Sequence, residues 1–185
     1  MAHKTQIEWC KRVKKSYPKY FKNKRVLDIG SLDVNGNNKG LFENCDYVGL
    51  DIIEGSNVDV VSIAHEFESD ELFDVVLSTN SFEHDMYFKF TLKKMVDLLR
   101  PLGLMFCCGS SGHKEHGTLR RTAWASGTTQ INNDEWARYY KNLTVKDFSD
   151  VLNPTETFSI FSLKDVEKDI RFVGIKRDKD LSNEI

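Results

Sequence analysis

Arg25-Val26-Leu27-Asp28-Ile29-Gly30 predicts a buried strand that ends in a sharp turn, and a second predicted strand, 46–51, ends in Asp51. In α/β domains this pairing holds the adenosine part of a cofactor. The turn lets backbone N–H groups approach the ligand, and the strand-end carboxylate accepts hydrogen bonds from both ribose hydroxyls. The stretch therefore predicts a cofactor-binding α/β domain.

The turn after Gly30 favours one kind of cofactor over another. A dinucleotide pyrophosphate needs a second glycine for close backbone approach, but Leu32 occupies that position and the next glycine is Gly36. A dehydrogenase usually also needs a separate substrate domain, for which 185 residues leave little room. S-adenosylmethionine has no phosphates. Asp28 suits its cationic amino-acid end and Asp51 its ribose, so we expect this cofactor rather than NAD.

Two motifs further along the chain sharpen this hypothesis. They are FDVVLSTNSFEH (73–84) and LLRPLGLMF (98–106). With LDIG (27–30) and the acidic end of the second strand, they resemble, in the right order, the motifs of class I S-adenosylmethionine-dependent methyltransferases of the type 11 group. The match covers roughly residues 24–110, and four motifs at sensible spacing are far more specific than one.

The resemblance implies which residues contact the cofactor. They are Asp28, Gly30, Ser31, Asn35, Gly36, Asp51, Ile52, Ala64, His65, Asn80 and Ser81. Leu32 and Val34 replace glycines of the family's loop, so we expect 35–38 to carry the tight turn. Ile63 stands where an acidic residue often binds the adenine amino group, and His65 is a candidate to replace that acid in part.

The order of the predicted elements indicates an α/β, Rossmann-like three-layer sandwich, with a mostly parallel seven-stranded sheet and an antiparallel edge hairpin. Predicted helices cover 4–20 and 84–99, and predicted strands cover 25–30, 46–51, 58–61, 73–79, 102–109, 157–162 and 170–176. The link 52–57 is too short for a crossover helix, so either that helix is lost or the third strand is marginal. We expect an N-terminal helix in 1–24, the methyltransferase domain in 25–177 and a polar tail in 178–185.

Three histidines are candidates for catalysis. His84 follows the fourth strand, and His113 and His116 lie in the long polar segment 110–132, which is typical of a lid or binding loop. Two histidines without a third ligand do not make a metal site, and we expect none. The aromatic residues Trp124, Trp136, Tyr139 and Tyr140 either wall a substrate pocket or belong to the core.

Composition indicates an ordinary globular protein with a formal net charge of −2. The first 25 residues carry nine Lys or Arg and one Glu, which suits either a basic amphipathic helix or a polyanion-binding arm. The helical spacing of the apolar residues Ile7, Val13 and Tyr17 favours the amphipathic helix. The four cysteines form no paired motif, and no apolar run reaches membrane-spanning length or has the form of a signal peptide. We expect a cytoplasmic protein without a membrane partner.

These observations predict methyl transfer from S-adenosylmethionine, by in-line displacement, to the hydroxyl or amine of a small molecule or sugar. No Asn/Asp-Pro-Pro-Tyr-type motif, which in this superfamily marks methylation of amino groups on nucleic-acid bases and glutamine, is present. Methylation of nucleic acid or protein is the alternative at the substrate level. A catalytically silent S-adenosylmethionine-binding regulatory module is the alternative from another class. The sequence leaves the oligomeric state open.

Overall fold

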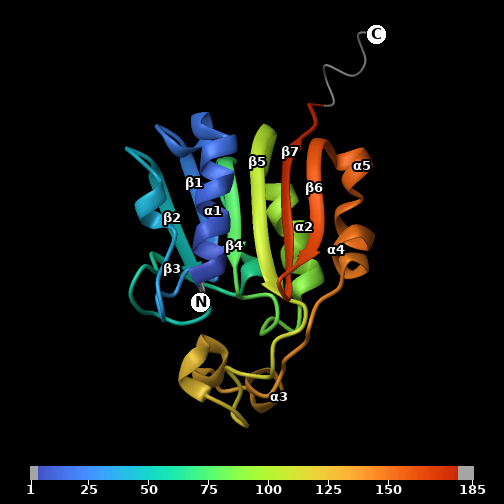
Figure 1. Cartoon of the computed structure of the whole chain (residues 1–185). Helices are drawn as coiled ribbons and strands as arrows, with labels where there is room; N and C mark the ends of the chain where they lie inside the picture. The colour runs from blue at the N-terminus through green and yellow to red at the C-terminus, as the bar shows by residue number, and fades with distance from the viewer. Residues whose placement is uncertain (1–3, 179–185) are drawn as a thin grey trace.

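A computed structural model describes residues 4–178, and its centre is one seven-stranded sheet in the order β3-β2-β1-β4-β5-β7-β6 (Figure 1). The strands are β1 (Arg25–Ile29), β2 (Asp46–Asp51), β3 (Val60–Val61), β4 (Phe73–Thr79), β5 (Leu99–Ser110), β6 (Phe158–Val166) and β7 (Asp169–Lys176). All neighbours are parallel except β7, which runs antiparallel to both β5 and β6. The predicted fold class is confirmed.

Helices cover both faces of the sheet and give the molecule two cores. On one face, α2 (Phe88–Leu98) lies behind the strands in Figure 1, and α4 (Val145–Leu152) and α5 (Pro154–Thr157) lie next to β6. There Leu92 and Met95 of α2 pack in one cluster with residues of β1, β4 and β7. On the other face, α1 (Lys4–Ser16) lies in front of the sheet, and its Cys10 and Val13 join a second cluster.

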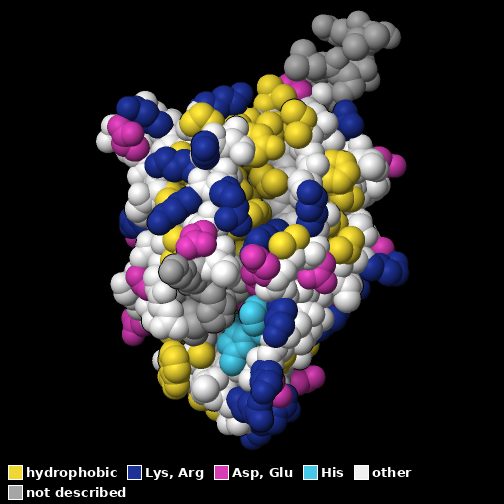
Figure 2. All heavy atoms as spheres, in the orientation of Figure 1, with side chains coloured by type: hydrophobic (Ala, Val, Ile, Leu, Met, Phe, Trp, Pro, Cys, Tyr) yellow, Lys and Arg dark blue, Asp and Glu magenta, His cyan; other side chains and the backbone are white. Residues whose placement is uncertain are grey.

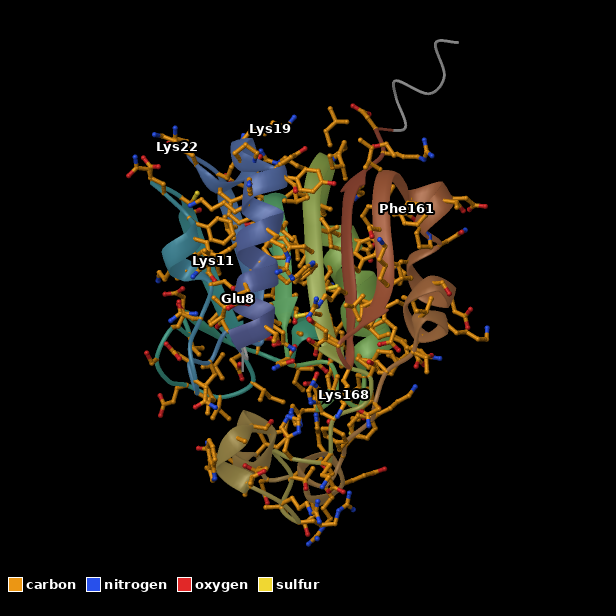
Figure 3. The ribbon with its side chains drawn as sticks, in the orientation of Figure 1. Glu8, Lys11, Lys19, Lys22, Phe161 and Lys168 are labelled. Carbon is orange, nitrogen blue, oxygen red and sulfur yellow. The ribbon has the colours of Figure 1, made fainter. Side chains whose placement is uncertain are left out.

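The N-terminal helix is amphipathic, as predicted, but shorter. It ends at Ser16 instead of 20 because Pro18 has no N–H to donate and disfavours helical backbone at Tyr17; a 3₁₀ turn, Pro18–Phe21, follows. Val13 is buried and Tyr17 half-buried. Glu8 and Lys11 are exposed on the outward side of α1 (Figure 3).

The second predicted helix begins four residues late. Residues 84–87 form a turn, because the Asp85 carboxylate accepts hydrogen bonds from the Tyr87 backbone N–H at 2.8 Å and the Thr91 hydroxyl at 2.5 Å. The helix ends at Leu98, and β5 begins at Leu99 rather than 102. The delayed start leaves 80–87 as a turn at the carboxyl end of β4, where polar side chains can reach a ligand.

The connection between β2 and β3 carries no helix in the structure. Residues 52–59 cross directly, and β3 has only two residues. The crossover helix is thus absent from this connection, and the third strand is also marginal, two residues shorter than the predicted 58–61. Within the described residues, no helix is long and apolar enough to cross a membrane. The predicted tail lies outside the described residues except for Asp178.

Candidate functional site

A crevice that is partly open to solvent lies beyond the carboxyl ends of β1, β2 and β4. Open α/β sheets bind ligands at this edge. Figure 1 shows the segment 111–142, with α3 (Asp134–Ala137), running below these strand ends. The strands and the turns that follow them contribute Ile29, Gly30, Leu32, Val34, Leu50, Asp51, Ile52, Ser62, Ala64, Asn80, Ser81, His84 and Asp85; the segment contributes Ala125, Ser126, Gly127, Thr128 and Trp136.

Asp51 is the acidic group at the end of β2, and its carboxylate is held in place by backbone. One oxygen accepts from the Leu32 N–H at 3.0 Å and the other from the Ile52 N–H at 2.7 Å. Burial raises the pKa of Asp51, and these two N–H donors offset part of that rise. A carboxylate has further lone pairs, so Asp51 can still accept from a diol.

Gly30 brings the turn after β1 close to the turn after β4. Its φ is +74°, and a Cβ at this position would lie 2.3 Å from the Ser81 Cβ. The Gly30 N–H donates to the Leu50 carbonyl at 2.8 Å, which ties the turn to β2. Only glycine allows both the left-handed backbone and this close approach.

Six of the predicted cofactor residues line one crevice: Gly30, Asp51, Ile52, Ala64, Asn80 and Ser81. Five others, Asp28, Ser31, Asn35, Gly36 and His65, do not line it. Ser31 is buried and donates its hydroxyl to the Asn57 carbonyl at 2.8 Å. His65 packs its ring against Tyr87, with centroids 5.0 Å apart, and its role toward adenine stays a prediction.

Asn35 and Gly36 lie in the predicted tight turn, but this turn does not face the crevice. Gly36 has a φ of +114° and its N–H donates to the Asp33 carboxylate at 2.7 Å. A Cβ on Gly36 would lie 3.4 Å from the Ile7 Cδ1, so the turn packs against α1. The apolar Leu32 and Val34, which replace glycines of the family's loop, line the crevice instead.

Asp28 differs most from its predicted role. It is buried, and its Oδ2 accepts from the Tyr47 hydroxyl at 2.5 Å, while its Oδ1 has no hydrogen-bond partner among the described residues. Side chains alternate along β1, so Val26 points to the same side as Asp28, and Val26 packs in the apolar cluster that includes residues of α1. Leu27 and Ile29 point to the other side and pack in the cluster that includes residues of α2. Asp28 therefore faces the α1 side of the sheet and does not line the crevice.

Asp28 should make the stability of the protein depend on pH. Burial raises its pKa from 3.8 to about 7, so the folded state binds this proton more tightly than the unfolded state. The stability from that proton is full below pH 4 and is lost as pH rises toward 7. Relative to Asp28→Asn, the wild-type free energy of unfolding should fall by about 4 kcal/mol between pH 4 and pH 8, since one pKa unit is worth about 1.4 kcal/mol. Urea denaturation of both proteins at several pH values measures this; a constant difference would contradict it.

The segment 110–132 was predicted to cover the crevice, but the residues that do so were not identified in the sequence. Ser126, Gly127 and Thr128 line the crevice, and a Cβ on Gly127 would lie 3.2 Å from the Asp51 Oδ1. Trp136, one of the four aromatic residues that the sequence offers as pocket wall or core, lines the crevice and donates its indole N–H to the His84 carbonyl at 2.8 Å. Trp124, in contrast, is 66% exposed. The polar, glycine-bearing composition signalled a loop but not which part of it turns inward.

Comparison with solved structures agrees with this geometry. A Burkholderia thailandensis 1,6-didemethyltoxoflavin N1-methyltransferase with bound 1,6-didemethyltoxoflavin and S-adenosylhomocysteine matches with a TM-score of 0.62 and 14% identity, over 93% of this chain and 78% of that one. The chain has the class I methyltransferase fold. A Clostridium acetobutylicum S-adenosylmethionine-dependent methyltransferase shares it (TM-score 0.60, 10% identity, 96% and 92% covered). The N-methyltransferase NodS from Bradyrhizobium japonicum, in complex with S-adenosylhomocysteine, matches with a TM-score of 0.54 and 13% identity, over 93% of this chain and 86% of that one.

The sequence itself matches no protein-family model and has no significant match among curated proteins. The narrower resemblance to the type 11 group therefore stays a prediction. At these identities, the structural likeness shows the methyltransferase fold alone.

At one end of the crevice of this methyltransferase fold, four side chains form a compact cluster. The rings of His84 and His116 meet edge to face with centroids 5.1 Å apart, and Tyr140 packs against both at 5.5 and 5.1 Å. Glu83 lies beside them. Burial lowers the pKa of His84 to about 3 and raises that of Glu83. Burial also raises the pKa of Tyr140 to about 12.

His113 is not part of this cluster. Its Nε2 lies 3.5 Å from the Asp169 Oδ1 at the start of β7. Figure 2 shows histidine side chains at the surface where the sheet meets the segment 111–142. Of the three predicted catalytic histidines, the structure thus brings His84 and His116 together and places His113 elsewhere.

Proposed function

We propose that this protein transfers the methyl group of S-adenosylmethionine to a hydroxyl or amine of a small molecule or sugar. The observation that carries the proposal is the crevice itself, in which Asp51 ends β2 opposite the Gly30 turn within the class I methyltransferase fold. The two neighbours with S-adenosylhomocysteine in their structures share that fold. Their ligands support the proposal.

The lining residues fit the parts of this cofactor. The Asp51 carboxylate suits the ribose diol, and the apolar side chains of Leu32, Ile52 and Ala64 suit the adenine ring. Asn80 and Ser81 would face the methionine part. When bound, S-adenosylmethionine supplies a methyl group that is already activated by the positive sulfur. The chain then contributes position and a dry environment, which can supply on the order of 7–11 kcal/mol toward the barrier.

A small acceptor agrees with the surface around the crevice. The segment 111–142 packs Gly127 against Asp51 and Trp136 against His84, which restricts access for a large substrate. On the face shown in Figure 2, Lys and Arg side chains gather around α1, and Asp and Glu side chains lie between them and the segment 111–142. Nucleic-acid binding usually depends on a basic track that reaches the site.

Turnover tests the proposed function. The purified chain, given S-adenosylmethionine and pools of small hydroxyl and amine compounds, should release S-adenosylhomocysteine at a rate that depends on the pool. Asp46→Ala, at the opposite and exposed end of β2, is the matched control and should keep this rate. Cofactor binding without turnover on any pool would favour the regulatory module. Turnover only with RNA, DNA or a protein would replace the small acceptor.

A further inference from the structure

We propose that Glu83, His84 and His116 bind a divalent transition-metal ion at the acceptor end of the crevice. Each side chain offers one ligand atom, and these atoms all lie within 4.8 Å of one another. Tetrahedral ligands 2.0–2.1 Å from zinc are separated by about 3.3 Å, so a small inward rotation completes the site. Two imidazoles and one carboxylate are a ligand set of catalytic zinc sites, with a further position open to water or substrate.

Glu83 carries the strongest argument for a cation. It is 1% exposed, and neither carboxylate oxygen has a side-chain hydrogen-bond partner among residues 4–178; the backbone N–H groups of Glu83 and Ser110 offset only part of the cost of burial. A buried carboxylate without a cationic partner is costly, and buried charges in proteins are usually paired or coordinate metals. No Lys or Arg side chain of the described residues forms an ion pair with Glu83. A metal ion would supply the missing partner.

The two histidines are arranged as ligands. The His116 Nδ1 lies 2.9 Å from the Lys114 carbonyl, which can only accept, so Nδ1 is the donor there and the neutral ring offers the lone pair of Nε2 to a metal. A backbone carbonyl that orients the ring in this way is a common feature of metal-bound histidine. His84 is 4% exposed, and its Nδ1 has no hydrogen-bond partner within the described part of the chain.

Two glycines make room for this cluster. A Cβ on Gly109 would lie 3.2 Å from the Glu83 Oε2, and a Cβ on Gly117 would lie 2.6 Å from the His84 Cε1. Gly117 has a φ of +61°, which brings the segment back over His84 and places His116 beside it. The sequence suggested only the pair His113 and His116, whereas the fold supplies Glu83 and His84 from the turn after β4 as the further ligands.

The site adjoins the crevice, because His84 lines it together with Asn80 and Ser81. An ion there would bind an acceptor hydroxyl and lower its pKa, which favours a hydroxyl over an amine acceptor. The hydroxyl proton leaves to solvent, the oxygen forms a bond to the methyl carbon, and the carbon–sulfur bond breaks with its electron pair left on sulfur. This catalytic role rests on the proposed function; the binding of the ion does not.

Cobalt(II) and zinc(II) are the probes that test the site. The untagged chain should bind one Co²⁺ per molecule with a visible absorption band, and calorimetry should show one Zn²⁺. Mg²⁺ should bind far more weakly because two of the ligands are imidazoles. His116→Ala and Glu83→Gln should each weaken Co²⁺ binding at least a hundredfold, since loss of mere supporting contacts already costs 10–100-fold. His113→Ala, three residues away in the same segment, is the matched control and should bind Co²⁺ like the wild type.

Thermal melting provides a second measurement that does not need activity. With Zn²⁺ at about a hundredfold its dissociation constant, the wild-type Tm should rise by about 5–10 °C. Glu83→Gln should melt without metal at or above the wild-type temperature, because it replaces a buried carboxyl group that has no cationic partner by a neutral amide of the same shape, and it should gain nothing from Zn²⁺. It should also retain S-adenosylhomocysteine binding, which separates the metal site from the cofactor site.

Equal Co²⁺ binding by the wild type, Glu83→Gln and His116→Ala would overturn the proposal, as would no binding by any of them. Binding of one metal ion that depends on Glu83, by a chain that binds no S-adenosylhomocysteine, would support the metal site and defeat the proposed function. The two claims can therefore fail separately.

Discussion

Asp51→Ala should weaken the binding of S-adenosylhomocysteine by about a hundredfold. The substitution removes the acceptor for both ribose hydroxyls, and a hydrogen bond to a charged group contributes roughly 1.5–3 kcal/mol. Two such bonds amount to at least about 3 kcal/mol, and each 1.4 kcal/mol is a factor of ten in the dissociation constant. The substitution also frees the Leu32 and Ile52 N–H groups, which loosens the turn beside the ligand. Titration calorimetry measures the change.

Two variants sharpen this experiment. Asp51→Asn keeps an acceptor oxygen and the shape of the side chain, so its affinity for S-adenosylhomocysteine should lie between the affinities of the wild type and of Asp51→Ala. Asp46→Ala removes an exposed carboxylate from the other end of the same strand and should leave the affinity unchanged. An Asp51→Ala protein that binds S-adenosylhomocysteine within twofold of the wild type would show that the ribose lies elsewhere.

Gly30→Ala should lower the free energy of unfolding by about 2–5 kcal/mol. A left-handed backbone costs a non-glycine residue about 1–2 kcal/mol, and overpacking in a tight contact costs typically 1–3 more. The new methyl group would lie 2.3 Å from the Ser81 Cβ, so the turns after β1 and β4 must move apart. Because these turns form two walls of the crevice, cofactor affinity should fall with stability. Urea denaturation and calorimetry measure the two effects.

Gly40→Ala is the matched control. Gly40 lies in the short 3₁₀ turn Lys39–Leu41, has no positive φ, and an added Cβ there would meet nothing within 4 Å. The free energy of unfolding of Gly40→Ala should stay within about 0.5 kcal/mol of the wild-type value, as for other surface substitutions. If both alanine variants unfold alike, the close approach of Gly30 to Ser81 does not constrain the fold.

The strand pattern could be predicted because it depends on local signals. Buried β-branched runs and strand-end acids indicate where the strands lie along the chain and that Asp51 ends one of them, while the alternation of strands and helices and the family resemblance imply the sheet. The start of α2 could not be predicted, because the Asp85 side chain caps a turn that periodicity places inside the helix. A side chain that competes for backbone N–H groups leaves no trace in hydrophobic spacing.

The candidate site was predictable only in part for a similar reason. Sequence spacing shows that Asp28 lies on a strand but not which face of the sheet its side chain points to, and the Tyr47 hydroxyl that holds it comes from another strand. His116 lies 32 residues after His84, and only the path of the segment through Gly117 brings the two rings together. Contacts of this kind are set by tertiary packing.

Titration of the untagged wild-type chain with S-adenosylhomocysteine and, separately, with NAD tests the central claim most directly. The apolar Leu32 in the turn and the carboxylate of Asp51 predict binding of one S-adenosylhomocysteine per chain with a micromolar dissociation constant, and no measurable heat with NAD. Micromolar binding of NAD without a response to S-adenosylhomocysteine would contradict the account.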